Sequence, residues 1–502
     1  MSYLGRWVLA GLLLAAVGGA ATAASESGQG SGTLPRLTVS ENNRYLVTEK
    51  GDPVFLNADT AWGLARELKR EDVAAYLKRR REQHYNAILV SVFGINETAY
   101  GRNLFEMGKD GKPDPTRPIV TPGANPASEK EYDAWDHVDY CVDQAAKEGF
   151  YVLFLPTWGT NVTGSYDGRN EKARFFDTKN AYTYGRFVGD RYKGRSNVIF
   201  IIGGDVRAVY EHHDFSDIFR AMAKGVVAGV NGKDPAGPAD YASTFMSYHP
   251  PKSSVQSSGW FHNDPWLDFN SIQEWPEAQI EATLRDWAMT PVKPTWLMEG
   301  RYEQYYKNKY KAEQWGPWQV RYQAYQTVFS GGCGHTYGNE LTYGFGRPDA
   351  KEPRPAGTWQ EHLEDPGAVQ MQHLAALMTR WTKAQYLARV PDQALLDGDT
   401  GKAERLKSDR LTATRGADGD YAMVYSANGR PIRVVMSRLA GPRMNASWFS
   451  PRTGQWNVGG KEQAEAKPFA EGIPSGAGAS VHEFVPPGAA GDGNDWVLVL
   501  SR

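Results

Sequence analysis

From residue 37 to about residue 390, short apolar runs alternate with longer segments whose apolar residues recur every three to four positions. A short apolar run indicates a buried strand, whereas the three-to-four spacing indicates an amphipathic helix. Eight strand–helix units in a row are the count of a closed (β/α)8, or TIM, barrel, so we predict an α/β fold for this part. The predicted strands are 54–57, 87–93, 151–156, 198–202, 242–248, 267–272, 295–298 and 334–337.

Two of the predicted helices show the helical period clearly. Within residues 70–83, the apolar side chains of Val73, Tyr76 and Leu77 share one face, and the basic run 78–81 that follows is typical of a solvated helix end, with an anion site as the alternative. Within residues 132–150, Gly149 stands where the helix should stop.

After residue 390 the pattern changes to short β-type runs separated by turn signals such as Asn428-Gly429, with no helical period between them. We therefore predict that a barrel domain over 37–396 is followed by a β-sandwich domain over 400–502. The predicted strands of this second domain are 411–414, 421–425, 432–436, 446–449 and 496–500.

The first 23 residues have the order of a secretory signal peptide: Arg6, then an apolar run, then small residues up to Ala23. The run is too short to span a bilayer, and no cysteine follows it that could carry a lipid anchor. A Ser/Gly-rich lead-in, 24–36, precedes the barrel. We expect an exported protein, periplasmic or extracellular, without a membrane anchor.

Composition narrows the function classes for this chain of 502 residues. The net charge of −2 lacks the basic surplus that nucleic-acid binding needs. Aromatic residues make up 12% of the chain, which suits carbohydrate binding, although core packing accounts for most of them equally well. The two cysteines, Cys141 and Cys333, are predicted to be buried thiols rather than a disulfide.

The functional residues of a (β/α)8 barrel lie where its strands end and the following loops begin. Each predicted strand of this chain is followed by at least one polar side chain that could face a ligand. In chain order these candidates are Asp59 with Trp62, Asn96, Thr157 with Trp158, Asp205, His249, Gln273, Glu299, and His335 with Tyr337 and Asn339.

Asp205 and Glu299 stand out because each follows an apolar strand, one the fourth and the other the seventh. Hydrolysis of a glycosidic bond requires such a pair, one carboxyl to protonate the leaving oxygen and one to attack the sugar or activate water. The alternatives are an N-cap of the next helix for Asp205 and a salt bridge to Arg301 for Glu299. Asp59 has a capping alternative as well.

Signatures of other enzyme classes are missing. The chain has no Gly-x-Ser-x-Gly elbow, no phosphate-binding Gly-x-x-x-x-Gly-Lys, no His-Glu-x-x-His and no strand-coupled Gly-x-Gly-x-x-Gly. His212 and His213 are adjacent, a spacing that suits loop histidines better than a metal pair. We therefore predict no cofactor and no metal.

Four segments together resemble the apiosidase-like glycoside hydrolases, family 140, over about residues 37–396. The tail segment Trp448-Phe-Ser-Pro-Arg-Thr-Gly454 is similar to the small β-domain, labelled collagen-binding, that usually follows that catalytic domain. The four segments are Phe55-Leu-Asn-Ala-Asp-Thr-Ala-Trp62, Ile202-Gly-Gly-Asp205, Leu297-Met-Glu-Gly-Arg-Tyr-Glu303 and Gly334-His-Thr-Tyr-Gly-Asn339.

The resemblance implies a retaining (β/α)8 hydrolase with Asp205 as the catalytic acid and Glu299 as the nucleophile. The family's characterised activity releases apiose-linked side chains from the pectic polysaccharide rhamnogalacturonan II. This chain departs from its relatives after the sixth strand, where it has Gln273-Glu-Trp-Pro276 in place of Gln-Ser-Gly-His. We expect Trp62 and Trp158 to stack on sugar faces, and the following side chains to bond sugar hydroxyls: Asp59, Asn96, His249, Gln273, His335 and Tyr337.

Two other functions stay open at this point. A relative that had lost catalysis would bind carbohydrate through the barrel mouth, and the C-terminal domain could bind collagen. The presence of both Asp205 and Glu299 favours the enzyme, because a degenerate site usually loses one carboxylate first.

Overall fold

The computed structural model of the protein describes residues 33–94, 96–234, 239–305, 315–346 and 357–502. The predicted signal peptide, 1–23, lies outside the described residues, as does most of the predicted lead-in. Within the described ranges, no helix combines the length and the apolar character needed to cross a membrane.

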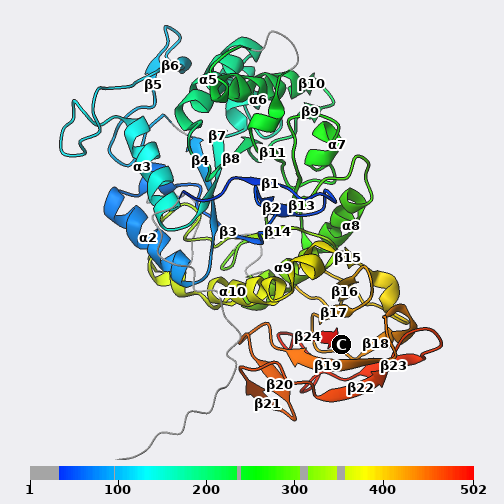
Figure 1. The fold of residues 1–502 in the computed structure, drawn as a ribbon. Helices are drawn as coiled ribbons and strands as arrows, with labels where there is room; N and C mark the ends of the chain where they lie inside the picture. The colour runs from blue at the N-terminus through cyan, green and yellow to red at the C-terminus, as the bar shows by residue number, and fades with distance from the viewer. Residues whose placement is uncertain (1–32, 95, 235–238, 306–314, 347–356) are drawn as a thin grey trace, which may run out of the picture. The chain divides into compact units, whose positions relative to one another are not determined.

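A parallel eight-stranded sheet forms the centre of the larger domain (Figure 1), which confirms the predicted barrel. Neighbours along the chain are neighbours in the sheet, and its two outer strands meet through the backbone amide of Asp268, which donates to the carbonyl of Met246 at 2.9 Å. The strands are β3 (Leu56–Thr60), β4 (Ala87–Phe93), β7 (Tyr151–Thr157), β8 (Val198–Gly203), β11 (Met246–His249), β12 (Asn270–Gln273), β13 (Thr295–Glu299) and β14 (Gly334–Tyr337).

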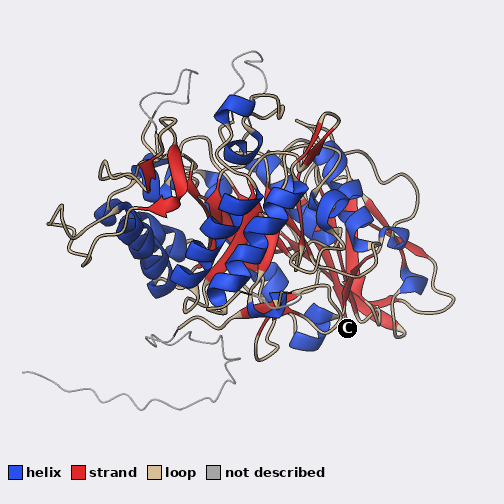
Figure 2. Ribbon diagram, turned by 90° about the horizontal axis from the view of Figure 1, so that it is seen from above, coloured by secondary structure: helices blue, strands red, loops and turns tan. Residues whose placement is uncertain are grey.

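Helices follow every barrel strand and surround the sheet, as Figure 2 shows in blue around red. Because these helices cover one face of each strand while the packed barrel interior covers the other, strands such as β4 and β7 are buried along their whole length. The helices are α2 (Arg70–Glu82), α3 (Ala134–Lys147), α5 (Thr178–Tyr192), α6 (Ser216–Val230), α7 (Ser257–Phe261), α8 (Pro276–Trp287), α9 (Pro317–Phe329) and α10 (Pro366–Thr379).

Short elements that the sequence pattern did not predict occupy the connections. Three antiparallel pairs lie outside the barrel: β1 (Leu37–Val39) with β2 (Leu46–Thr48), β5 (Phe105–Met107) with β6 (Pro113–Pro118), and β9 (Val209–Tyr210) with β10 (His213–Asp214). Short helices are α1 (Leu64–Glu67), α4 (Thr160–Thr163) and α11 (Lys383–Leu387), and 3-10 turns are η1 (Glu171–Ala173), η2 (Tyr241–Ser243), η3 (Glu361–Glu364), η4 (Gln393–Leu395) and η5 (Met436–Arg438).

The basic run in α2 corrects the prediction of a solvated helix end. The side chain of Arg80 is fully buried, and its Nε lies 2.6 Å from Asp59 Oδ2 on strand β3. A charged helix position can therefore face the barrel when the strand beneath it supplies the opposite charge, a pairing that helical periodicity alone does not reveal.

The C-terminal region is all β, as predicted. Its main sheet runs in the order β15-β16-β17-β24-β19-β20-β21, with β22 also paired to β19, and β18 pairs with β23 as a second small sheet. Strand β24 (Trp496–Ser501) is central, between β17 (Tyr421–Ser426) and β19 (Arg443–Phe449). The remaining strands are β15 (Arg389–Pro391), β16 (Leu411–Gly416), β18 (Ile432–Val435), β20 (Trp456–Val458), β21 (Lys461–Gln463), β22 (Ala470–Pro474) and β23 (Val481–Phe484).

The two faces of this main sheet enter two different cores. Ala422 and Val424 of β17 pack into the β-domain's own core, whereas Tyr421, Met423 and Tyr425 belong to the core that fills the barrel domain. Alternate residues of a strand point to opposite faces, so the barrel helices cover one whole side of the sheet. Residues 33–502 consequently form one compact unit.

Both cysteines are buried and unpaired by any disulfide, which confirms the prediction for Cys141 and Cys333. Burial raises the pKa of each thiol above its ordinary value.

Candidate active site

A cavity of about 380 Å³ opens where the barrel strands end, at the C-terminal side of the sheet. Asp205, Glu299, Trp62, Trp158 and Gln273, five of the residues predicted from the sequence, all line it. The structure therefore brings the two predicted carboxyl groups to one cavity. The other lining residues are Lys252, Glu274, Gly300, Arg301, Tyr302, Tyr305, Glu340 and Tyr343.

Two glycines place Asp205 at this cavity. Gly203, Gly204 and Asp205 have consecutive positive φ angles of 89°, 139° and 55°, a turn that side chains rarely permit. A Cβ on Gly203 would lie 2.5 Å from the ring of Tyr248, and one on Gly204 would lie 2.8 Å from the backbone nitrogen of Gly159. The turn lifts Asp205 out of the strand, and it does not cap helix α6, which begins at Ser216.

The pKa of Asp205 lies well above that of an ordinary aspartate. Burial is the main cause that raises the pKa of its carboxyl to about 7, and the negative charge of Glu299 adds to the effect. The His249 ring, a hydrogen bond from Gln273 and the ammonium of Lys252 act in the opposite direction. At neutral pH this carboxyl can therefore carry a proton, whereas an ordinary aspartate cannot.

A β-bulge turns Glu299 toward the cavity. Ile272 of β12 lies opposite Leu297 of β13, but the next residue, Gln273, lies opposite Glu299, so β13 holds one extra residue, Met298. In a regular strand Glu299 would share the face of Leu297; the extra residue moves its side chain to the other face. Tyr302 donates its hydroxyl proton to Glu299 Oε1.

His249 connects the two carboxyl residues. Its Nδ1 accepts a hydrogen bond from the backbone N–H of Asp205 at 3.2 Å, so the neutral ring carries its proton on Nε2. Nε2 lies 3.0 Å from Glu299 Oε2. The imidazole therefore fixes the backbone beside one carboxyl group and faces the other.

Two tryptophans form an aromatic wall on one side of the cavity. The rings of Trp62 and Trp158 meet edge to face with centroids 5.0 Å apart. Trp62 Nε1 donates to the hydroxyl of Tyr302 at 2.9 Å, and Trp158 Nε1 donates to the hydroxyl of Tyr166 at 3.2 Å. These hydrogen bonds fix the orientation of both rings, so their faces are ordered before a ligand enters.

The loop after β12, whose sequence differs from that of the family, carries Trp275, and three cationic side chains surround this ring beside the cavity. The ring of Trp275 is covered by the guanidinium of Arg301 at 3.3 Å, the ammonium of Lys252 at 3.9 Å and the guanidinium of Arg405 at 3.9 Å, measured to the ring centroid. Arg405 belongs to the segment that follows the barrel, so residues outside the barrel strands and helices shape this rim.

Three predicted substrate ligands lie on the wrong side of their strands. Asp59 Oδ2 accepts hydrogen bonds from Tyr76 and Arg80 of α2, both at 2.6 Å, which places Asp59 toward the helical layer and excludes the capping role too. Tyr337 lies opposite Asp59 in the sheet and donates to Glu303 Oε2 at 2.6 Å.

His335, two residues before Tyr337, shares its face. Burial lowers the pKa of His335 to about 3, so this ring is neutral and enclosed. The fourth correction is Asn96, whose side chain binds the backbone N–H and carbonyl of Phe105 at 2.9 and 3.0 Å and thereby holds the start of β5. None of these four residues is among the described residues that line the cavity.

Three further residues in or beside the cavity, Tyr302, Lys252 and Tyr166, were not predicted from the sequence. Tyr302 stands within the Leu297–Glu303 motif that carries the family resemblance, so the motif contained the signal. Lys252 and Tyr166 lie in loops whose course no local pattern predicts. Within the described part of the chain, no group of three or more His, Cys, Asp and Glu side chains is arranged to hold a metal ion.

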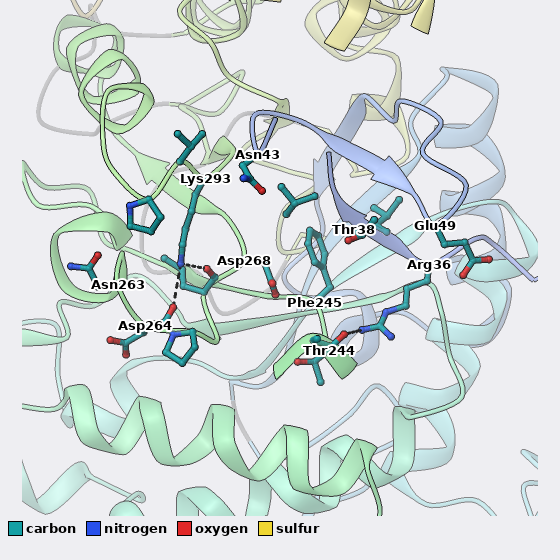
Figure 3. A pocket seen from close by; sticks show the side chains of 17 residues that line it. Arg36, Thr38, Asn43, Glu49, Thr244, Phe245, Asn263, Asp264, Asp268 and Lys293 are labelled. Carbon is teal, nitrogen blue, oxygen red and sulfur yellow. Dashed lines mark hydrogen bonds between the residues drawn. The ribbon is translucent and has the colours of Figure 1, made fainter. Parts of the chain in front are cut away.

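A larger cavity, about 770 Å³, lies at the end of the barrel where the strands begin, the N-terminal end (Figure 3). Three of its charged groups bind backbone atoms: Lys293 Nζ donates to the carbonyls of Leu267 and Asp264, Asp268 Oδ2 accepts from the N–H of Met246 at 2.7 Å, and Arg36 donates to the carbonyl of Ala242 at 2.8 Å. Catalytic groups of such barrels lie at the opposite end, so we assign this cavity a structural role.

Comparison with known proteins points to the same class of enzyme as the cavity that holds Asp205 and Glu299. Residues 40–384 match the family described as "Apiosidase-like, catalytic domain". The chain belongs to this family. Residues 390–501 match the model described as "Putative collagen-binding domain of a collagenase". A search of curated proteins found no match.

Two solved structures share both the fold and part of the sequence with this apiosidase-like protein. One, described as a glycoside hydrolase family 5 from Bacteroides vulgatus ATCC 8482, is 29% identical with a TM-score of 0.74, and the match covers 93% of each chain. The other, described as a glycoside hydrolase, is 29% identical with a TM-score of 0.73, covering 93% of this chain and 97% of that one. The apiosidase-like domain and these neighbours identify the protein as a glycoside hydrolase.

Proposed function

We propose that the protein is an exported, retaining glycoside hydrolase acting on a plant-type pectic polysaccharide, with Asp205 as acid/base and Glu299 as nucleophile. The observation that carries the proposal is the pair of carboxyl residues in one cavity. Burial and the nearby Glu299 charge raise the pKa of Asp205 to about 7, so Asp205 can carry a proton at neutral pH. Hydrolysis by double displacement needs such a pair in opposite protonation states.

In the first step, Glu299 Oε2 or Oε1 attacks the anomeric carbon, and the bond from that carbon to the leaving oxygen breaks. The leaving oxygen takes the proton of Asp205 and departs as an alcohol. The products are a glycosyl ester on Glu299 and an ionised Asp205. Tyr302, which hydrogen-bonds Glu299 Oε1, holds the nucleophile in position.

The second step uses a change in charge. Once Glu299 is esterified it no longer carries a negative charge, so one cause of the raised pKa of Asp205 disappears. Asp205 can then remain ionised, take a proton from water and direct the hydroxide to the anomeric carbon. The ester bond breaks, the sugar is released with its original configuration, and both carboxyl groups return to their starting states.

The proposed substrate class rests on the family and on the cavity walls. The apiosidase-like match supports a pectic, apiose-containing glycan. The Trp62–Trp158 wall supplies apolar faces for sugar rings, while Gln273 supplies a polar group. The loop that departs from the family, with Trp275 under three cations, borders the same cavity and is where the choice of sugar would differ.

The test is release of monosaccharide from a panel of pectic and arabinose-containing glycans, with Glu299→Gln as the blank. We expect the wild type to release one sugar with retained anomeric configuration, read by proton NMR before mutarotation, and Glu299→Gln to be slower by about 10³-fold or more. Retention also requires the two carboxyl groups to lie roughly 5–5.5 Å apart in a crystal structure.

Two results would contradict the proposal. Initial release of the inverted anomer would replace the nucleophile with a general base, and wild-type rates in Glu299→Gln would remove Glu299 from the mechanism. Tight binding of glycans by the wild type with no turnover would support the alternative, a non-catalytic carbohydrate-binding protein.

A further inference from the structure

We propose that Tyr166 is a stacking platform for the sugar ring on the leaving-group side of the scissile bond. The inference rests on the proposed function and deepens it, because it states that the group displaced from the anomeric carbon is itself a carbohydrate. Three observations support it: the exposure of the residue, the anchoring of its loop, and its hydrogen bond to the cavity-lining Trp158 on the β7–β8 side of the barrel.

The ring of Tyr166 is unusually open to solvent. The residue is 61% exposed, and it is the one aromatic residue among the exposed large hydrophobic residues of the described chain. An exposed aromatic ring next to a ligand cavity costs free energy in the unbound state, which binding of an apolar face recovers. Sugar rings offer such faces through their axial C–H groups.

The platform is rigid although it is exposed. The Tyr166 hydroxyl accepts a hydrogen bond from Trp158 Nε1 at 3.2 Å, and its backbone carbonyl accepts one from the hydroxyl of Tyr210 at 2.9 Å. The same Tyr210 hydroxyl accepts from the N–H of Arg207 at 3.2 Å. The loops after β7 and β8 are thereby joined, so a ligand that stacks on Tyr166 does not have to order the ring first.

The position of Tyr166 assigns it to the leaving group. Its hydroxyl accepts a hydrogen bond from Nε1 of Trp158, which lines the cavity together with Asp205 and Glu299. Tyr166 follows β7 and Asp205 follows the adjacent β8, whereas Glu299 ends β13 across the barrel. The leaving oxygen receives its proton from Asp205, so the departing part of the substrate lies on the β7–β8 side.

Two substrates separate this role from a structural one. The first is the glycan of the panel that the wild type cleaves best, and the second is the glycosyl fluoride of the sugar it releases, whose leaving group is a single atom with nothing to stack. We expect Tyr166→Ala to lower kcat/KM about tenfold on the glycan and to leave the fluoride within about twofold. Tyr166→Phe keeps the ring and should stay near wild type on both.

The outcomes distinguish the platform from the proposed function. An equal loss on both substrates in Tyr166→Ala, or a lower Tm with parallel losses, would show that Tyr166 only supports the loop and would overturn the platform. Unchanged turnover of the glycan would overturn it as well. A wild type that cleaves no glycan of the panel would instead remove the proposed function.

Discussion

Asp205 combines an unfavourable backbone conformation with an unfavourable charge. Its φ of 55° is rare for a residue with a side chain, and its ionised form is disfavoured by burial and by Glu299. Because its pKa is raised in the folded state, the protein loses stability as pH rises from the ordinary range of aspartate toward 7. A strained backbone and a carboxyl group whose ionised form is destabilised are expected at a site arranged for proton transfer.

The first prediction concerns the alkaline limb of the pH profile. Asp205 must be protonated to act as the acid, so kcat/KM should fall above pH of about 7. The ammonium of Lys252 lowers the pKa of Asp205; its removal in Lys252→Met should raise that pKa and move the limb to higher pH. At pH about 8 the variant should keep roughly two- to threefold more of its own maximal kcat/KM than the wild type.

Lys252→Arg is the matched control, because it preserves the positive charge and should leave the limb in place. The measurement is kcat/KM from pH 4 to about 9 on the panel substrate. A limb that moves to lower pH in Lys252→Met would contradict the assignment of Asp205 as the acid.

The elements of the barrel were largely predictable, whereas the direction of single side chains was not. Strands β4 and β14 begin and end at the predicted residues, because long or sharply bounded apolar runs are distinctive. Which face of a strand a residue occupies depends on register, and here the prediction was wrong for Asp59 and Tyr337. Glu299 reaches the cavity because of the Met298 bulge, a feature that no sequence periodicity reveals.

In the C-terminal domain, strands β21 and β23 were not predicted, for a related reason. Lys461–Gln463 and Val481–Phe484 are mostly exposed, so they lack the apolar run by which β17 and β24 were identified. Edge strands are held by pairing to a neighbour rather than by burial of their own side chains.

The second prediction tests the turn that carries Asp205. In Gly204→Ala the new Cβ would meet the backbone nitrogen of Gly159 at 2.8 Å and the Cα of Trp158 at 3.3 Å, and φ there is 139°. We expect a loss of about 1–3 kcal/mol in the free energy of unfolding, and a fall in kcat of about 10²-fold from displacement of Asp205.

Gly194→Ala provides the control, because a Cβ there has nothing within 4 Å. It should change stability by less than about 1 kcal/mol in either direction and leave kcat unaffected. Thermal melting and steady-state kinetics on both variants decide the matter; wild-type kcat in Gly204→Ala would mean that the turn tolerates a side chain.

At the scale of the whole molecule, a buried ion pair fastens the β-domain to the barrel domain. Arg321 of α9 donates from Nε and Nη2 to the two carboxylate oxygens of Asp495 at 2.9 and 2.8 Å, and both side chains are almost completely buried. Asp495 also accepts from the Tyr425 hydroxyl at 3.0 Å, and Trp318 Nε1 donates to the carbonyl of Ala427 at 2.8 Å. The domains therefore share polar contacts as well as apolar packing.

The third prediction follows from that ion pair. Asp495→Asn removes the negative charge and leaves the buried Arg321 guanidinium uncompensated, which should cost about 3–5 kcal/mol in the free energy of unfolding. Asp190→Asn, which loses only the exposed ion pair to Lys193, should cost about 1 kcal/mol or less. Denaturant titration of both variants measures the difference; equal effects would show that the Arg321–Asp495 pair does not hold the domains together.

The shared core also bears on the collagen-binding label of residues 390–501. The side of the sheet that displays Tyr421, Met423 and Tyr425 is packed against the barrel domain, so no ligand can reach it in the folded protein. A collagen-binding activity would have to use the opposite side or the strand edges. Retention of the intact protein on a collagen column, compared with a protein of similar charge, tests it directly.

The central place of β24 has a consequence for how the protein is made. Its residues leave the ribosome about 160 positions after Tyr337, which completes the barrel strands, and translation at roughly 5–20 residues per second makes that interval about 10–30 s. Until then β17 and β19 lack the strand between them, and the ion pair between Arg321 of α9 and Asp495 cannot form. A nascent chain in that interval is a natural client for chaperones, and slow translation of residues 338–495 should increase its aggregation.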